Sequence, residues 1–190
     1  MYSAQSILEA AGLSKTAINN ILQDNVNNRA IIDAKRFFTF DLETGNLSTT
    51  GKNPIMQIGL VLDNGKMISY EIDPYGDATE YSEAALAKTG FSIKNNKLYY
   101  GNKEVKSSMS IAKGMRAFAE RLKAEKFDIH NDALGGYNSA KFDMPVLLNT
   151  LSMFATDSVW AKNPDAQEAV KIFEELKLIS ISHSGDITKV

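Results

Sequence analysis

The chain has 190 residues, of which 44% are hydrophobic, and its formal net charge is −2. That length is sufficient for one hydrophobic core, so we expect one domain with a small appendage. The small net charge predicts no general attraction to nucleic acid, so binding of nucleic acid would need a local basic patch or a bridging metal ion. Cysteine is absent, which excludes disulfides, thiolate metal sites and thiol catalysis. The sequence shows neither an apolar run of about 18 residues nor a secretory signal, so we expect a soluble, cytoplasmic protein with no membrane partner.

Residues 1–35 are predicted to form a helical hairpin, which we treat as an N-terminal appendage. Gly12 is typical of a helix end, and Ser14 is typical of the cap of a second helix. The spacing of the apolar residues resembles the helix-turn-helix of DNA-binding repressors. Lys15 is the only basic residue on the second predicted helix, and phosphate contacts depend on Lys and Arg. We therefore favour a hairpin that packs on the sheet or on a partner over one that reads DNA.

The segment over 36–45 is an apolar strand that carries two carboxylates. Successive side chains of a strand point to opposite faces, so Asp41 and Glu43 point the same way. The other face is apolar and consists of Phe38, Phe40 and Leu42. Two like charges side by side repel, and a hard divalent cation with oxygen ligands would compensate them. The alternative is a strand end whose acids simply reach solvent, which is common for an isolated D-x-E pattern.

The next elements are predicted from apolar runs and the turns between them. Strands over 36–42, 55–62 and 66–72 should form an antiparallel meander, because Asn64-Gly65 is typical of a type I′ turn with two positive φ angles. A short helix is expected over 80–89, and a small exposed hairpin or an extended loop over 93–105.

An amphipathic helix is predicted to begin at Ser110. Its apolar face consists of Ile111, Met115, Phe118, Ala119 and Leu122. Basic residues lie around its other face, and they are Lys113, Arg116, Arg121 and Lys123. These are most simply a solvated face, and they are also the best candidate patch for a nucleic-acid strand. A strand over 133–137 follows.

Asp143 precedes Met144-Pro145 and an apolar run, which is typical of a helix N-cap with proline in the first turn. A carboxylate at a helix N-terminus is favoured by the helix dipole and stays ionised, as a metal ligand must. The two roles are therefore compatible. Because acids clustered from separate segments are what a two-metal site needs, we expect Asp143 to join Asp41 and Glu43.

Two motifs in these segments carry a family resemblance. The pattern F-D-x-E-T-G over 40–45, followed by P-I-x-x-I-G over 54–59, resembles the first motif of the DnaQ-like (DEDD) 3′–5′ exonuclease superfamily. The pattern G-Y-N-x-x-x-F-D-x-P-x-L-L over 136–148 is similar to the second motif, with the spacing of family-B DNA polymerase proofreading domains. The resemblance implies an α/β, ribonuclease H-like fold over 36–190. That fold is a mixed sheet, an antiparallel three-strand meander plus parallel strands, flanked by helices.

The resemblance also implies a site and a substrate. Asp41, Glu43 and Asp143 would hold two Mg²⁺ or Mn²⁺ ions in a metal-dependent 3′–5′ exonuclease. The 3′-terminal nucleotide would be bound by Thr44, Gly45, Asn138 and Phe142. The implied partners are single-stranded or 3′-terminal nucleic acid and a polymerase or other protein.

The C-terminal segment departs from the family pattern. Family members carry a fourth carboxylate on a helix, within Y-x-x-x-D or H-x-x-x-x-D, whereas here His183 and Asp186 are only three residues apart. Gly185 between them argues against a helix, and the composition favours a loop. Asp186 is therefore a weak candidate for the fourth acid, and His183 a weak candidate for the general base. The third motif is degenerate, or it is supplied by a longer chain or by a partner.

Three classes of function remain open from the sequence. The first is the metal-dependent exonuclease, acting alone or as a proofreading unit. The second is a catalytically impaired binding or structural module on the same fold. The third is a DNA-binding regulator that uses the segment over 1–35.

Overall fold

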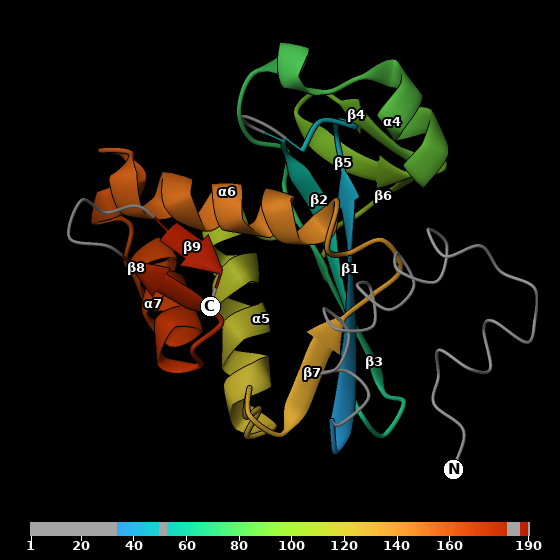
Figure 1. Cartoon of the computed structure of the whole chain (residues 1–190). Coiled ribbons are helices and arrows are strands. Elements are labelled where there is room, and N and C mark those ends of the chain that lie inside the picture. Colours follow the sequence, from blue (N-terminus) through green and yellow to red (C-terminus); the bar gives the residue numbers. More distant parts are fainter. Residues whose placement is uncertain (1–33, 50–52, 182–186, 190) are drawn as a thin grey trace, which may run out of the picture.

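The computed structural model describes residues 34–49, 53–181 and 187–189 (Figure 1). Its elements in chain order are β1 (Arg36–Thr44), β2 (Ile55–Val61), β3 (Met67–Glu71), the 3₁₀ turn η1 (Ala78–Glu80), α4 (Glu83–Thr89), β4 (Phe91–Lys94), β5 (Lys97–Tyr100), β6 (Lys103–Glu104), α5 (Ile111–Ala124), β7 (Asp132–Gly135), α6 (Asp143–Thr156), η2 (Trp160–Lys162), α7 (Pro164–Glu175), β8 (Ile179–Ile181) and β9 (Ile187–Lys189). The helical hairpin expected over 1–35 lies, but for its last two residues, outside this part of the chain and stays a prediction.

The main sheet has the strand order β3-β2-β1-β7. The pairs β1–β2 and β2–β3 are antiparallel, and β7 runs parallel to β1. The predicted α/β class, with a mixed sheet and a three-strand meander flanked by helices, is confirmed. In the described residues, β7 alone forms the parallel part of this sheet.

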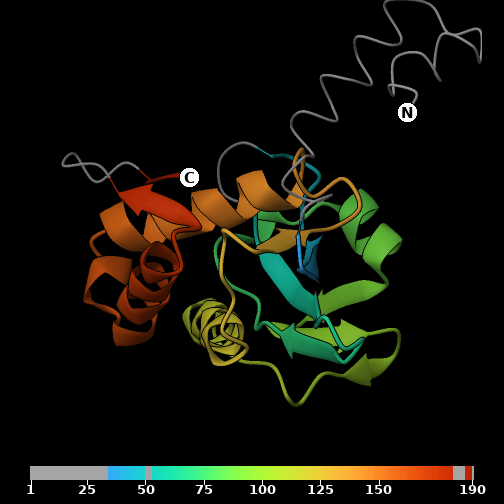
Figure 2. The same ribbon diagram turned by 60° about the horizontal axis from the view of Figure 1, so that its bottom comes forward.

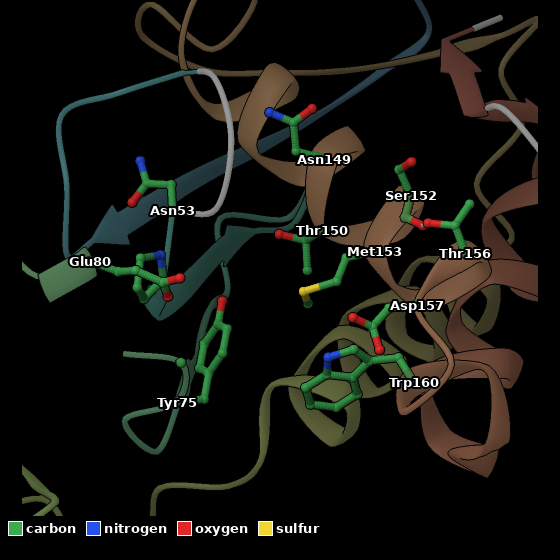
Figure 3. A pocket seen from close by; sticks show the side chains of 12 residues that line it. Asn53, Tyr75, Glu80, Asn149, Thr150, Ser152, Met153, Thr156, Asp157 and Trp160 are labelled. Carbon is green, nitrogen blue, oxygen red and sulfur yellow. The ribbon is translucent and has the colours of Figure 1, made fainter. Parts of the chain in front are cut away.

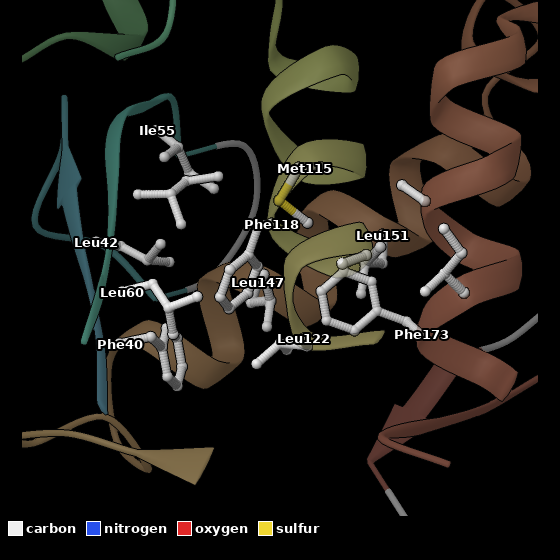
Figure 4. Packing of buried hydrophobic residues seen from close by; sticks show 14 of the residues in the cluster. Phe40, Leu42, Ile55, Leu60, Met115, Phe118, Leu122, Leu147, Leu151 and Phe173 are labelled. Carbon is white, nitrogen blue, oxygen red and sulfur yellow. The ribbon is translucent and has the colours of Figure 1, made fainter. Parts of the chain in front are cut away.

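One face of the sheet is covered by helices (Figures 1 and 2). Alternation along β1 buries Phe38, Phe40 and Leu42 on that face, as predicted. The predicted apolar side of α5 packs against them, and the rings of Phe40 and Phe118 lie 6.0 Å apart between centroids. Phe118 contacts Phe173 of α7 in turn, at 5.8 Å, so α5 lies between the sheet and α7 (Figure 4). This packing fixes β1, and with it the two carboxylates, on a rigid support.

The turn between β2 and β3 differs from the predicted type I′ turn. Gly65 has a φ of 80°, whereas Asn64 does not have a positive φ. The Gly65 N–H donates to the Leu62 carbonyl at 2.8 Å, and the Leu62 N–H donates to the Lys66 carbonyl at 2.9 Å. These bonds define a three-residue hairpin loop that places only its glycine in the left-handed region. The strand pairing was predicted correctly, and the turn type was wrong.

The small sheet β4-β5-β6 corresponds to the hairpin predicted over 93–105. Its turn holds Asn95 and Asn96 at φ angles of 51° and 59°. The expectation that this hairpin is exposed is wrong in part, because Leu98 is buried with Phe91 and Met56. The helix expected over 80–89 begins later, at α4, because the Ser82 hydroxyl accepts from Ala85 N and so sets the start of the helix.

Three of the four basic residues of α5 are paired with acids. Arg116 pairs with Glu120 and with Asp165 of α7, at 2.7 and 2.8 Å. Arg121 pairs with Glu125, and Lys123 with Glu175. The solvated-face interpretation therefore describes this surface, and it is not an uncompensated patch for phosphates.

The C-terminal strands β8 and β9 pair antiparallel in a separate two-stranded sheet. This small sheet does not join the main sheet. None of the helices in the described part of the chain combines the length and apolar character that crossing a membrane requires.

Candidate active site

The two predicted acids of β1 lie on the sheet face opposite α5. Asp41 is exposed and Glu43 is partly buried. Their partners across β2 are Gly59 and Gln57. Because Gly59 has no side chain, Asp41 borders an open hollow of about 390 Å³ on this face. The Asp41 carboxylate is therefore accessible from solvent.

The strand β7 leaves β1 just before the two acids. Their pairing ends where Thr39 faces Gly135. A Cβ atom on the next residue, Gly136, would lie only 2.3 Å from the Phe40 carbonyl oxygen. Any residue other than glycine would therefore clash with the strand at this position. The close approach lets the chain turn away here, so that another element can reach the backbone edge of β1 beyond Phe40.

Asp143 is the group that reaches this edge. Its Oδ1 accepts a hydrogen bond from the Leu42 N–H at 3.1 Å, and its side chain is buried. Leu42 stands between Asp41 and Glu43, so the bond brings the third predicted acid onto β1 beside the other two. The N-cap prediction for Asp143 is wrong, because the cap is Phe142 and Asp143 is the first helical residue. The carboxylate bonds to the strand instead of closing its own helix.

The three carboxylates influence one another. Burial raises the pKa of Glu43, and the charges of Asp41 and Asp143 raise it further, while Lys88 lowers it. Burial also raises the pKa of Asp143, the bond from Leu42 N–H opposes this, and Asp41 adds to the increase. The site therefore concentrates negative charge that the nearby cation of Lys88 compensates only in part.

The donor set suits a hard divalent cation. Carboxylate oxygens are the ligands that such ions prefer, and an ion between them would remove the repulsion that adds to the effect of burial on the pKa of Glu43. Across residues 34–49, 53–181 and 187–189, no three acidic or histidine side chains are already arranged around a metal position. Asp41, Glu43 and Asp143 thus fit such an ion by charge and chemistry.

The residues predicted to bind the terminal nucleotide have differing surroundings. The Thr44 hydroxyl donates to the Asn46 carbonyl at 2.7 Å, and Thr44 is buried. Gly45 is covered by the Tyr81 ring, so closely that a Cβ would lie 2.4 Å from Tyr81 Cδ1. Phe142 packs against the main core. Thr44 and Gly45 therefore shape the end of β1, and their contact with substrate stays a prediction.

Asn138 lies in the turn before α6, is exposed and has a φ of 57°. Its carbonyl accepts from the N–H groups of Lys141 and Phe142, at 3.0 and 3.1 Å. The exposed amide side chain is free to face a ligand, and its predicted role remains a prediction.

Lys88 of α4 is a cation near Glu43 that the sequence reasoning missed. It is exposed, and its charge opposes in part the increase in the pKa of that carboxyl. The signal in the sequence was its place directly before the Thr89-Gly90 turn, although nothing in that pattern shows which strand the helix faces.

The weak candidates His183 and Asp186 lie outside the described residues. The strands that flank them, β8 and β9, pair as a hairpin. The described elements that directly flank 182–186 are therefore strands and not a helix carrying a fourth acid.

A family model described as DNA polymerase family B, exonuclease domain, matches residues 7–171. The chain belongs to this family. The match includes Asp41, Glu43 and Asp143 and ends before His183. It confirms the resemblance drawn from the two motifs, including the likeness to family-B polymerases.

Solved structures of exonuclease I are also similar to the chain. The zinc-bound E. coli ExoI–ssDNA complex is 18% identical, with a TM-score of 0.43, and the match covers 70% of this chain and 27% of that one. The E. coli enzyme with a dT13 oligonucleotide is 20% identical, with a TM-score of 0.42, covering 68% and 26%. A product-bound exonuclease I is 16% identical, with a TM-score of 0.44, covering 82% and 36%. The chain thus matches only about a third or less of their length. A search of the curated proteins found no match.

Proposed function

We propose that the chain is a metal-dependent exonuclease that releases nucleotides from the 3′ end of single-stranded nucleic acid. The observation that carries the proposal is the hydrogen bond from Leu42 N–H to Asp143, which joins three acids from two distant segments. Membership of the family-B exonuclease domains supports the same reaction.

Asp41, Glu43 and Asp143 would hold the Mg²⁺ or Mn²⁺ ions. When bound, such ions would activate a water molecule for attack and stabilise the 3′-oxygen leaving group. Asp143 is oriented by its bond to the strand, and exposed Asp41 borders the open hollow. Lys88 would attract the terminal phosphates, because its cation lies near Glu43 on an otherwise acidic surface.

The proposal extends to the substrate contacts and the partner. Thr44, Gly45, Asn138 and Phe142 would border the terminal nucleotide, where stacking contributes without reading sequence. A polymerase is the proposed partner, since family-B exonuclease domains take their name from such enzymes. Either Asp186, with His183 as base, or the partner would complete the acidic set.

Single-stranded oligonucleotides labelled at the 3′ or the 5′ end test this function. We expect Mn²⁺ or Mg²⁺ to release labelled mononucleotide at once from 3′-labelled strands, and to give a ladder of shortening products from 5′-labelled strands. EDTA should stop both. Comparing the rate of release from DNA strands with that from RNA strands shows whether the enzyme prefers deoxyribose or ribose. If the purified chain releases no more nucleotide than Asp41→Asn with either metal, the catalytic proposal fails.

A catalytically impaired binding module is the second candidate. It is favoured by the β8–β9 hairpin and by the three acids, rather than four, in the described part of the chain. Calorimetry separates the candidates, because an impaired module would bind single strands without binding divalent ions tightly. The third class, a DNA-binding regulator, depends on residues 1–35, and the described structure adds nothing in its favour.

The raised pKa values of Glu43 and Asp143 predict a metal-sensitive stability. A raised carboxyl pKa means that the folded protein holds protons that the unfolded chain has released. Their contribution to stability is therefore greatest below the unfolded pKa of about 4, and it is lost as the pH rises through the raised folded values. Mg²⁺ or Mn²⁺, which binds the ionised forms, should restore stability at neutral pH.

The measurement is the melting temperature against pH, with and without metal. We expect the stabilisation by Mn²⁺ to be larger at neutral pH than at acidic pH, because protons compete with the ion for the carboxylates as the pH falls. Glu43→Gln serves as the comparison, and it should flatten both trends. Equal stabilisation of Glu43→Gln and the parent chain would contradict the assignment of Glu43 as a ligand.

A further inference from the structure

A cavity of about 400 Å³ lies between the C-terminal half of α6 and the segment after β3 (Figure 3). This volume is in the range of small-molecule sites, about 300 to 1,000 Å³. Thr150, which lines it, follows Asp143 by seven residues of the same helix, so it lies about 10 Å further along the axis. The cavity is therefore separate from the acidic site.

The apolar walls of the cavity are formed by Tyr75, Met153 and Trp160 (Figure 3). The Tyr75 hydroxyl accepts from Ile55 N at 2.9 Å, and the Tyr75 backbone exchanges two bonds with the Tyr81 hydroxyl. The Trp160 ring packs on Phe154, with 5.2 Å between centroids. Both aromatic walls are thus held in place before any ligand arrives, which limits the entropy cost of binding.

The charged groups of the cavity are carboxylates. Glu80 stands on the wall beside Tyr75, and Asp157 stands on the opposite wall beside Trp160 (Figure 3). Among the described residues, no lysine, arginine or histidine lines the cavity, and neither carboxylate forms an ion pair. Phosphates and carboxylates would be repelled there, so this cavity does not suit the path of a nucleic-acid strand.

We propose that this cavity binds a small organic cation, an amine carried on an aromatic or branched apolar body. The ammonium group would lie against Glu80 or Asp157, while the body would pack between Tyr75, Met153 and Trp160. Charge-assisted hydrogen bonds and the attraction of a cation to an aromatic face would both contribute. A lysine side chain from another protein shares this charge, but its narrow chain would leave much of the cavity empty.

The fluorescence of Trp160 gives a direct measurement, because it is the only tryptophan in the chain. The full chain is titrated with 2-phenylethylamine, 2-phenylethanol and phenylacetate, which share one body and differ in charge. We expect a saturable change in emission with the amine, binding at least about tenfold weaker with the alcohol, and none with the acid. N-acetyl-lysine amide should bind more weakly than 2-phenylethylamine.

Two conservative variants locate the ligand. Glu80→Gln and Asp157→Asn keep the shape of the side chains and remove the charge, and at least one of them should weaken amine binding about tenfold. Glu83→Gln changes an exposed acid that does not line the cavity, and it should bind as the parent chain does. Calorimetry repeats the comparison without relying on emission. Equal binding of the three phenyl compounds, preference for the lysine amide, no saturable binding, or unchanged affinity in both variants would each overturn the proposal.

Discussion

Asp143→Asn is expected to reduce 3′-nucleotide release by about 1,000-fold or more while the protein stays folded. Loss of one carboxylate from a divalent site removes several kcal/mol of transition-state stabilisation, and each 1.4 kcal/mol corresponds to about tenfold in rate. The asparagine side-chain oxygen can still accept from Leu42 N–H, so the bond between α6 and β1 is kept. Asp41→Asn and Glu43→Gln should cause losses of similar size.

The measurement is single-turnover release from a 3′-labelled strand, paired with a melting curve for each variant. Asp77→Asn is the control, since Asp77 is an exposed acid whose side chain makes no capping bond. Asp143→Ala separates the two roles, because it also removes the partner of Leu42 N–H and should lower stability by about 1 to 3 kcal/mol. Retention of most activity in Asp143→Asn would contradict the assignment of Asp143 as a metal ligand.

Much of the support for the site could be predicted from local patterns. Alternation along β1 placed Asp41 and Glu43 on one face, because a strand has a period of two residues whatever surrounds it. The 3.6-residue period of α5 likewise identified its buried side. Both predictions depend only on neighbours in sequence and on the presence of one core.

The parts that were wrong depend on groups far apart along the chain. Asp143 looked like an N-cap, but its carboxylate accepts a hydrogen bond from the N–H of Leu42, which is 101 residues away. The basic side of α5 was the best candidate patch for a nucleic-acid strand, but Arg116 pairs with Asp165 of α7. Leu98 looked exposed within its hairpin, but it covers Met56 of β2. No local pattern carries these contacts, which appear only once the helices and sheets have packed.

The second large effect is expected from Gly136→Ala. A Cβ at this position would lie 2.3 Å from the Phe40 carbonyl oxygen, a backbone atom of a central strand that cannot rotate away. The crowding should cost about 2 to 3 kcal/mol of folding free energy, or more if β1 shifts. Because the chain from Gly136 leads to Asp143, we also expect nucleotide release to fall further than the loss of folded protein explains.

Gly135→Ala is the matched control, since a Cβ there would meet its nearest atom, Phe37 Cζ, at an ordinary 3.6 Å. Amide hydrogen exchange at Leu42 reports the geometry directly, because its N–H is protected by Asp143 rather than by the β7 strand, whose pairing ends at Gly135. Faster exchange at Leu42 in Gly136→Ala, but not in Gly135→Ala, would show that the acid has moved from the strand. Unchanged exchange with lost activity would instead show that Gly136 does not set the position of Asp143. The loss of activity would then be assigned to contacts between the G-G-Y-N turn and the substrate.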